Sequence, residues 1–135
     1  MSKIFDAVSR AMKDFDLKSD GTVAAGFVFP PDSIVFGGHF PGNPILPGIC
    51  QLEAIKAILE KTVGKAVRLT AVKSAKFFKP LQPGNYARFE MEKVDLNDKT
   101  IKLKVKVSSS ESRISEFKAT YVLDSSAEGN CDEKP

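Results

Sequence analysis

The only histidine of the chain, His39, lies fourteen residues before Glu53 in a segment crowded with proline and glycine. Residues 36–54, FGGHFPGNPILPGICQLEA, contain three prolines and four glycines. Histidine titrates near neutral pH and serves as a general base, and a carboxyl group serves as a general acid. Backbone N–H groups left unpaired at the start of a helix stabilise a developing oxyanion. Together these groups suit the removal of a proton next to a carbonyl group.

His39 itself has two interpretations. A lone histidine in a small domain is more often structural than catalytic. Here two glycines precede it and a Phe-Pro-Gly sequence follows it, which fixes an irregular backbone course. Strained loops on rigid scaffolds often carry function. This setting favours the catalytic interpretation.

Glu53 also has two interpretations, and the sequence leaves both open. It can form a solvated ion pair with Lys56, three residues further along a helix, worth a few tenths of a kcal/mol. Its neighbours are mostly apolar, however, including Cys50 and Ala54. On the buried side of the helix, desolvation would favour the protonated carboxyl group and make Glu53 a candidate acid.

A helix is predicted to begin at Pro47 and to end near Gly64. Proline suits the first helical turn, and glycine is common just after the last one. At the start of this helix Gly48 would let a substrate carbonyl approach the free N–H groups closely. Cys50 lies in the same turn, where a thiol can become a nucleophile. Because the helix is strongly apolar and no second histidine exists, core packing is the favoured role for Cys50.

The remaining pattern predicts one α+β domain over residues 1–124 and a disordered tail over 125–135. Residues 3–15 have an amphipathic helical stripe, and 22–30 alternate as a strand. After Lys65 the period changes to that of strands, predicted within 66–78, 85–96, 100–109 and 114–123. Short connections favour an antiparallel sheet, here curled around the apolar helix. Such a sheet needs cover, which predicts a dimer.

Composition excludes several classes of protein. The net charge of +3 is too small and too dispersed to indicate nucleic-acid binding. The two cysteines, Cys50 and Cys131, form no disulfide framework. No apolar run resembles a signal peptide or approaches a membrane span, so a cytoplasmic location is expected.

Two motifs resemble those of a known family. GHFPGNPILPGICQLEA, residues 38–54, is similar to the pattern G-H-F-P-x-x-P-x-x-P-G-x-x-x-x-E-A of bacterial 3-hydroxyacyl-(acyl-carrier-protein) dehydratases of the FabZ type, with FabA more distant. AKFFKPLQPGN, residues 75–85, resembles a second family stretch that ends in Pro-Gly-Asp. The first motif is long and specific, and the second alone would be weak.

The resemblance implies a hotdog fold and a homodimer, which can build higher oligomers. Each active site would combine His39 of one subunit with Glu53 of the other. The implied reaction removes water from a (3R)-3-hydroxyacyl thioester and gives the trans-2-enoyl thioester, and it requires no metal or redox cofactor. In it His39 takes the C2 proton, Glu53 protonates the leaving hydroxyl, and Gly48, with Ile49, holds the carbonyl.

The implied substrate is attached through 4′-phosphopantetheine to acyl carrier protein. The acyl channel would be lined by Phe40, Ile45, Leu46, Phe77 and Phe78, for each of which core packing is the alternative. The basic residues expected to dock the acidic carrier are Arg68, Lys73, Lys76 and Lys79, whose alternative role is a solvated strand face.

The chain also departs from the family pattern. The family segment that covers the active-site channel is replaced here by FDLKSDGTVAAGFVFP, residues 15–30. Ala57 replaces a glutamine one turn after the acid, and Asn85 replaces the aspartate of the second motif. Two alternatives therefore remain beside the dehydratase: a hotdog thioesterase, and a module that binds acyl carriers without catalysis.

Overall fold

The computed structural model describes residues 3–36, 46–92, 95–97, 99–110 and 112–124. In chain order the elements are α1 (Lys3–Arg10), β1 (Met12–Leu17), β2 (Val23–Phe27), the 3₁₀ helix η1 (Ile34–Phe36), α2 (Gly48–Val63), β3 (Val67–Phe77), β4 (Ala87–Met91), β5 (Asp95–Asn97), β6 (Thr100–Ser109) and β7 (Ser112–Leu123). No helix within these residues is long and apolar enough to cross a membrane.

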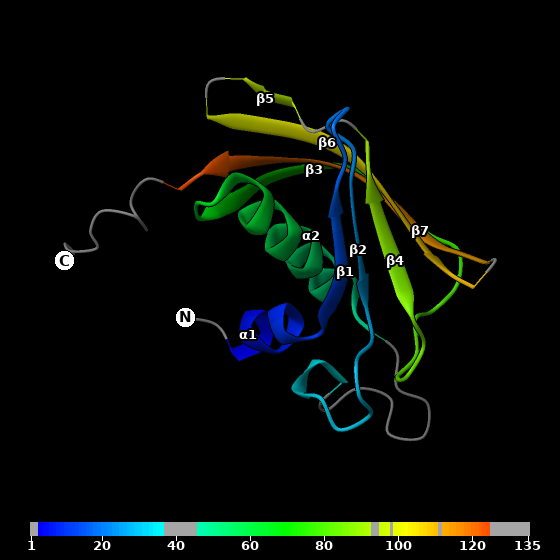
Figure 1. Ribbon diagram of the computed structural model, residues 1–135. Coiled ribbons are helices and arrows are strands. Elements are labelled where there is room, and N and C mark those ends of the chain that lie inside the picture. Colours follow the sequence, from blue (N-terminus) through cyan, green and yellow to red (C-terminus); the bar gives the residue numbers. More distant parts are fainter. Residues whose placement is uncertain (1–2, 37–45, 93–94, 98, 111, 125–135) are drawn as a thin grey trace.

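One antiparallel sheet of seven strands curls around α2, and α1 lies beside that helix (Figure 1). The strand order is β1-β2-β4-β6-β7-β3, and the short β5 pairs with β6 outside this path. This is the hotdog fold, so the predicted fold class is confirmed. The edge strands are β1 and β3.

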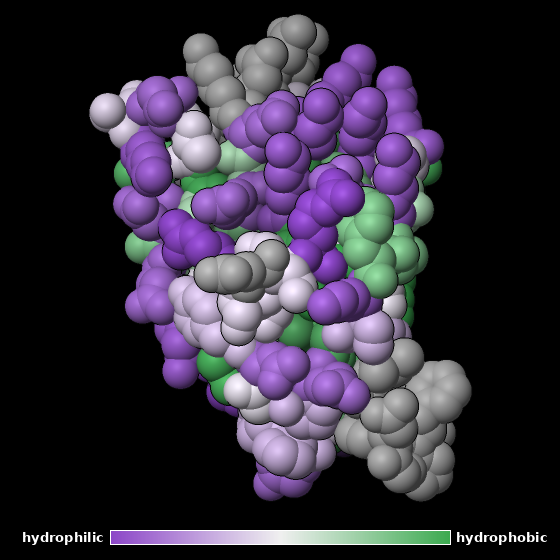
Figure 2. Space-filling model, turned by 90° about the vertical axis from the view of Figure 1, so that its right-hand side faces the viewer, coloured by the Kyte–Doolittle hydropathy of each residue, from purple (hydrophilic) through white to green (hydrophobic). Residues whose placement is uncertain are grey.

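The core lies between α2 and the concave face of the sheet. Along β6 the apolar residues are buried, whereas Lys102, Lys104 and Lys106 are exposed on the opposite face, as the period-two pattern predicts. Hydrophilic residues likewise dominate the side of the molecule turned to the viewer in Figure 2. Complete burial of the α2 residues Ile55, Ile58 and Leu59 contributes about 1.5–3 kcal/mol for each side chain.

Both ends of α2 follow the sequence prediction. Pro47 precedes the helix in an extended conformation, and Gly64 ends it with a left-handed φ of 75°. The Gly64 N–H donates to the Glu60 carbonyl at 2.8 Å. Glycine occupies this conformation without the steric cost that a side chain would add.

The predicted helix over residues 3–15 is wrong in its second half. The helix ends at Arg10, and Met12 and Phe15 belong to β1, which pairs with β2. Their spacing of three imitates a helical stripe, because β1 contains a bulge between Lys13 and Asp16 with Asp14 at a φ of 55°. Pairing with β2, which local periodicity does not reveal, decides the conformation.

Candidate active site

The first turn of α2 presents backbone donors that have no partner among the described residues. The N–H groups of Cys50 and Gln51 both donate hydrogen bonds to the Pro47 carbonyl, at 3.0 and 3.2 Å. The side chain of Pro47 forms no capping hydrogen bond. Helix geometry leaves the N–H groups of Gly48 and Ile49 without an intrahelical acceptor, at the positive end of the helix dipole. Ile49 itself is 63% exposed. This turn can therefore hold an anionic or polarised oxygen.

Phe77 of β3 lies directly against Gly48. A Cβ atom added to Gly48 would come within 2.9 Å of Cζ of the Phe77 ring. Only a glycine fits here unless the aromatic ring moves. The close approach that the sequence suggested for a substrate thus also serves a packing contact with β3.

A cavity of about 370 Å³ opens beside this contact. It is lined by Leu46, Pro47, Gly48, Gln51, Phe77, Phe78, Lys79 and Pro80. Leu46, Gly48, Phe77, Phe78 and Lys79 are residues that the sequence assigned to the site. The structure thus brings together the start of α2 and the second motif, which lie about thirty residues apart in the chain.

Phe77 and Phe78, the two phenylalanines of the cavity, each contact a side chain of β7. Phe77 packs edge-to-face on Phe117, with ring centroids 5.6 Å apart, and Arg113 lies 4.2 Å from the centroid of the Phe78 ring. Both rings are nevertheless exposed, Phe77 by 57% and Phe78 by 42%. Exposed aromatic rings fixed in this way form an apolar wall suited to an acyl chain or a partner surface.

Glu53 is half-buried on α2, and it makes no hydrogen bond or ion pair with another described residue. The alternative pairing with Lys56 does not form, because the Lys56 ammonium lies over the Phe5 ring of α1 at 4.6 Å. Glu53 instead lies near two weak acids, the Cys50 thiol and the Tyr121 hydroxyl. Burial and then the Glu53 charge raise the pKa of both groups.

Those neighbours are themselves fixed. The Tyr121 hydroxyl, fully buried, donates to the Leu52 carbonyl at 2.9 Å and so ties β7 to α2 just before Glu53. Cys50 is buried, and its raised pKa keeps the thiol protonated. A protonated, buried thiol is a poor nucleophile, which favours the packing role for Cys50.

Three predicted site residues, His39, Phe40 and Ile45, lie outside the described residues. The segment that carries them leads into Leu46, which is buried and whose N–H donates to the Leu81 carbonyl at 2.7 Å. This bond joins the entry to α2 to Leu81, which lies within the second motif, residues 75–85.

The four predicted docking residues lie on or just after β3 and are exposed: Arg68, Lys73, Lys76 and Lys79. The Lys79 ammonium donates to the Ser112 hydroxyl at 3.1 Å and also lines the cavity. The basic residues therefore follow the same sheet edge as the cavity wall.

Sequence reasoning missed a buried polar pair beside the cavity. Gln51 is 2% exposed and Ser115 is fully buried, and the Ser115 hydroxyl donates to Oε1 of Gln51. The available signal was Gln51 itself, an uncharged polar residue within an apolar stretch of helix. Its partner, 64 residues away, could not be identified from local pattern.

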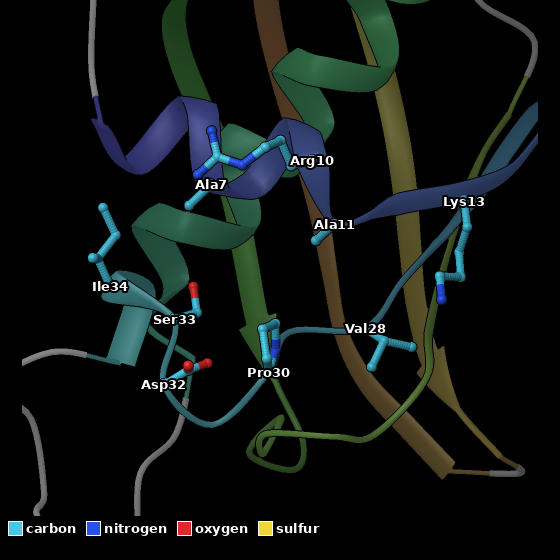
Figure 3. A pocket seen from close by; sticks show the side chains of 9 residues that line it. All are labelled: Ala7, Arg10, Ala11, Lys13, Val28, Pro30, Asp32, Ser33 and Ile34. Atoms are coloured by element: carbon cyan, nitrogen blue, oxygen red, sulfur yellow. The ribbon is translucent and has the colours of Figure 1, made fainter.

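A second cavity, of about 380 Å³, opens between α1, the segment after β2 and η1 (Figure 3). Its lining combines Arg10 and Lys13 with Asp32 and Ser33, and none of its residues belongs to the predicted site. The cavity at the start of α2 is therefore the better candidate, because it alone of the two joins free helix donors to an apolar wall.

Comparison with known proteins identifies the family of this chain. The family model for ApeI-like dehydratases, described as ApeI dehydratase, matches residues 16–118, which include His39, Gly48 and Glu53. The chain belongs to the ApeI-like dehydratase family. The resemblance to dehydratases of the FabZ type is thereby confirmed.

The alignment with an individual relative covers less of this ApeI-like protein than the family model does. The 3-hydroxyacyl-[acyl-carrier-protein] dehydratase FabZ of Caulobacter vibrioides is 34% identical over 98 residues, 64% of this chain and 62% of the relative. The match thus spans less than two thirds of that relative's length.

Two solved structures show how widely the fold is shared. The dehydratase heterocomplex ApeI:P from Xenorhabdus doucetiae gives a TM-score of 0.71 at 21% identity, covering 82% of this chain and 96% of that one. A variant of an acyl-CoA hydrolase from Staphylococcus aureus gives 0.54 at 14% identity, covering 78% and 67%. At these identities the likeness establishes the fold, which is shared by proteins named as a dehydratase and as a hydrolase.

Proposed function

We propose that this ApeI-like protein removes water from (3R)-3-hydroxyacyl thioesters carried by acyl carrier protein. The C2–H bond breaks, and its electron pair is delocalised onto the oxygen of the thioester carbonyl. As the C3–O bond breaks, this pair forms the C2–C3 double bond, and the hydroxyl leaves as water with one added proton. The product is the trans-2-enoyl thioester, and the same groups catalyse the reverse hydration.

In this proposal His39 accepts the C2 proton and Glu53 donates a proton to the leaving hydroxyl. The Gly48 N–H, with that of Ile49, binds the thioester carbonyl while negative charge collects on its oxygen. Positioned proton transfer contributes about 10²–10⁴-fold to a rate, and an oxyanion donor contributes about 10²–10³-fold. Leu46, Phe77 and Phe78, with Phe40 and Ile45, border the acyl chain.

One observation carries the proposal. The helix that begins with free N–H groups beside an apolar cavity also holds, five residues later, a half-buried carboxyl group with no partner among the described residues. A carboxyl group left unpaired in this setting is available for proton transfer. Membership of a dehydratase family supports the same assignment.

We further propose a homodimer that pairs two β3 edges. Of the eleven residues of β3, all of which the structure describes, only Val67 is buried. Val72, Phe77 and the adjoining Phe78 are large apolar residues that remain exposed along or beside this edge. Pairing would cover them and would bring His39 of one subunit to Glu53 of the other, giving two shared sites in a dimer that can assemble further.

The carrier protein would approach along the same edge in this proposal. Arg68, Lys73, Lys76 and Lys79 provide a basic surface for an acidic partner, and the cavity would receive the end of its phosphopantetheine arm. Charge complementarity of this kind raises the association rate more than the final affinity. We place the protein in the cytoplasm as one domain, residues 1–124; the tail predicted over 125–135 lies outside the described residues.

A thioester assay tests the proposal against its alternatives. Purified protein is given crotonyl and 3-hydroxybutyryl thioesters of acyl carrier protein, with enoyl absorbance and free thiol followed separately. Interconversion without thiol release is expected. Thiol release would instead identify a thioesterase, the activity in the name of the Staphylococcus aureus neighbour. A folded dimer inactive on several chain lengths would identify a binding module.

A further inference from the structure

Gln51 and Ser115 form a polar contact inside an otherwise apolar part of the core. Gln51 on α2 is 2% exposed, and Ser115 on β7 is fully buried. The Ser115 hydroxyl donates to Oε1 of the Gln51 amide at 2.5 Å. This bond uses the acceptor end of the amide and fixes the direction of the other end.

The donor end of the Gln51 amide has no partner among the described residues. Its NH₂ group carries two hydrogens, and no described group accepts either of them. A buried donor left without an acceptor destabilises the folded state. Such a group inside a natural protein indicates a role that offsets the cost, such as binding a ligand.

The surroundings of Gln51 show where that donor points. Gln51 lies three residues after Gly48, on the same face of α2, and helical side chains lean toward the N-terminus of their helix. Gln51 also lines the cavity with Gly48 and Phe77. Ser115 is the register partner of Phe77 on the neighbouring strand. The amide is therefore held between the cavity wall and the free end of the helix.

We infer that the Gln51 amide donates a second hydrogen bond to the carbonyl oxygen of the acyl thioester, next to the bond from the Gly48 N–H, and that Ser115 is a positioning residue which orients this amide. The identity of the ligand as a thioester rests on the proposed function. The inferred contact itself requires only an acyl carbonyl in the cavity. Because charge grows on this oxygen in the transition state, the contact strengthens during reaction.

A double-mutant cycle separates this role from simple core packing. Gln51→Met keeps the approximate length and volume of the side chain but removes both ends of the amide. It leaves the Ser115 hydroxyl without its acceptor, so both stability and activity should fall. The double variant Gln51→Met/Ser115→Ala replaces the pair with apolar groups, which is close to neutral for stability.

The double variant is therefore the decisive one. We expect it to regain most of the melting temperature lost by Gln51→Met, while kcat/KM stays about 10²-fold below that of the unaltered protein. The loss should fall mainly on kcat, because the bond strengthens in the transition state. Full kcat/KM in a stable double variant would overturn the inference and leave Gln51 a packing residue.

A binding measurement keeps this test independent of the proposed reaction. Crotonyl-pantetheine amide, which has the acyl carbonyl but a stable C–N bond, is titrated into the unaltered protein and the double variant. We expect weaker binding and a higher carbonyl stretching frequency in the double variant. Equal affinity and an unchanged frequency would refute the role of Gln51. Absence of turnover by the unaltered protein would refute only the dehydratase proposal.

Discussion

The two edges of the sheet are built differently. The β1 edge is short: its six residues include a bulge, and Asp14 there has a positive φ and accepts a hydrogen bond from the Tyr86 hydroxyl at 2.8 Å. The β3 edge has eleven residues, nine of which pair with β7 despite two register shifts. Val72 and Phe77 are exposed along it.

This difference indicates which edge receives a partner. Bulges, charged residues and short length protect an edge strand from pairing with another chain. The β1 edge has all three features, and the Tyr86 ring lies against Gly26 so closely that a Cβ there would collide with it. The β3 edge also has register shifts and basic residues, but it is nearly twice as long and carries exposed apolar side chains next to the candidate site. We therefore expect changes at β3 to alter assembly and activity, and changes at β1 to alter stability alone.

The largest expected effect is at Glu53 on α2. In the proposed dimer, pairing of two β3 edges brings His39 of the other subunit to this residue. Glu53→Gln should lower kcat by about 10²–10⁴-fold, because the amide cannot donate the proton that the leaving hydroxyl needs. The melting temperature should hardly change, since Glu53 has no bond to a described residue. Steady-state kinetics and calorimetry measure the two quantities.

Glu60→Gln is the matched control on the same helix. Glu60 accepts the Val67 N–H at 3.0 Å, so its replacement should affect stability and spare kcat. Equal activity losses in the two variants would remove the special role assigned to Glu53.

The next largest effect is expected from Val72→Asp on β3. Two such carboxylates brought close at a symmetric β3 pairing repel each other, so the dimer dissociation constant should rise by about 10²-fold. Activity should fall with it and recover at high protein concentration. Sedimentation at several concentrations, in parallel with the thioester assay, measures both.

Leu17→Asp gives the same substitution at an exposed apolar residue of β1, and it should leave the dimer intact. Dissociation by Leu17→Asp but not by Val72→Asp would reverse the assignment of the two edges.

A smaller effect is expected in the alkaline range. Burial raises the pKa of Tyr121 well above its ordinary value of 10.0, so the folded state favours the neutral phenol. Its stabilising contribution is complete below pH 10 and is lost as pH rises above 10, by about 1.4 kcal/mol for each pH unit. Tyr121→Phe should therefore flatten the fall of unfolding free energy between pH 10 and 11, measured by urea denaturation.

Tyr86 provides the comparison, because its pKa is also raised but its side chain is exposed. Tyr86→Phe should flatten the same pH profile less than Tyr121→Phe does. An equal or larger flattening by Tyr86→Phe would show that the burial of Tyr121 does not cause the alkaline loss of stability.

The smallest effect is expected from Tyr86→Phe at neutral pH. The substitution removes the hydrogen bond to Asp14 and keeps the ring against Gly26. The free energy of unfolding should fall by about 1 kcal/mol, with the dimer and kcat unchanged. A change in sedimentation would mean that the β1 edge also contributes to assembly.

The sequence predicted the parts of the fold that local chemistry decides. Pro47 and Gly64 delimit α2 because their backbone preferences suit its two ends, and alternation identified β6. The strand β1 could not be recognised, since its bulge imitates a helical spacing and its pairing with β2 is not local. Figure 1 shows the consequence, with β1 forming a sheet edge beside the two helices.

For the candidate site, too, the sequence predicted the residue types but not the contacts between distant segments. The residue types at Gly48 and Glu53 indicated their chemistry, but the side of α2 on which Glu53 lies depends on how the sheet curls. The Lys56 contact with Phe5, the Phe77 ring over Gly48 and the Gln51–Ser115 pair each join distant segments, so they required the structure. His39 stays a prediction from motif and chemistry.

A complementation experiment tests the shared site across the β3 edge most directly. His39→Ala and Glu53→Ala subunits, each inactive alone, are mixed in equal amounts and allowed to exchange, and native mass spectrometry measures the mixed dimers. Half of the dimers should be mixed, each with one complete site, so we predict about a quarter of the wild-type dehydratase activity. A mixture that contains these dimers and remains as inactive as either variant would contradict the shared site.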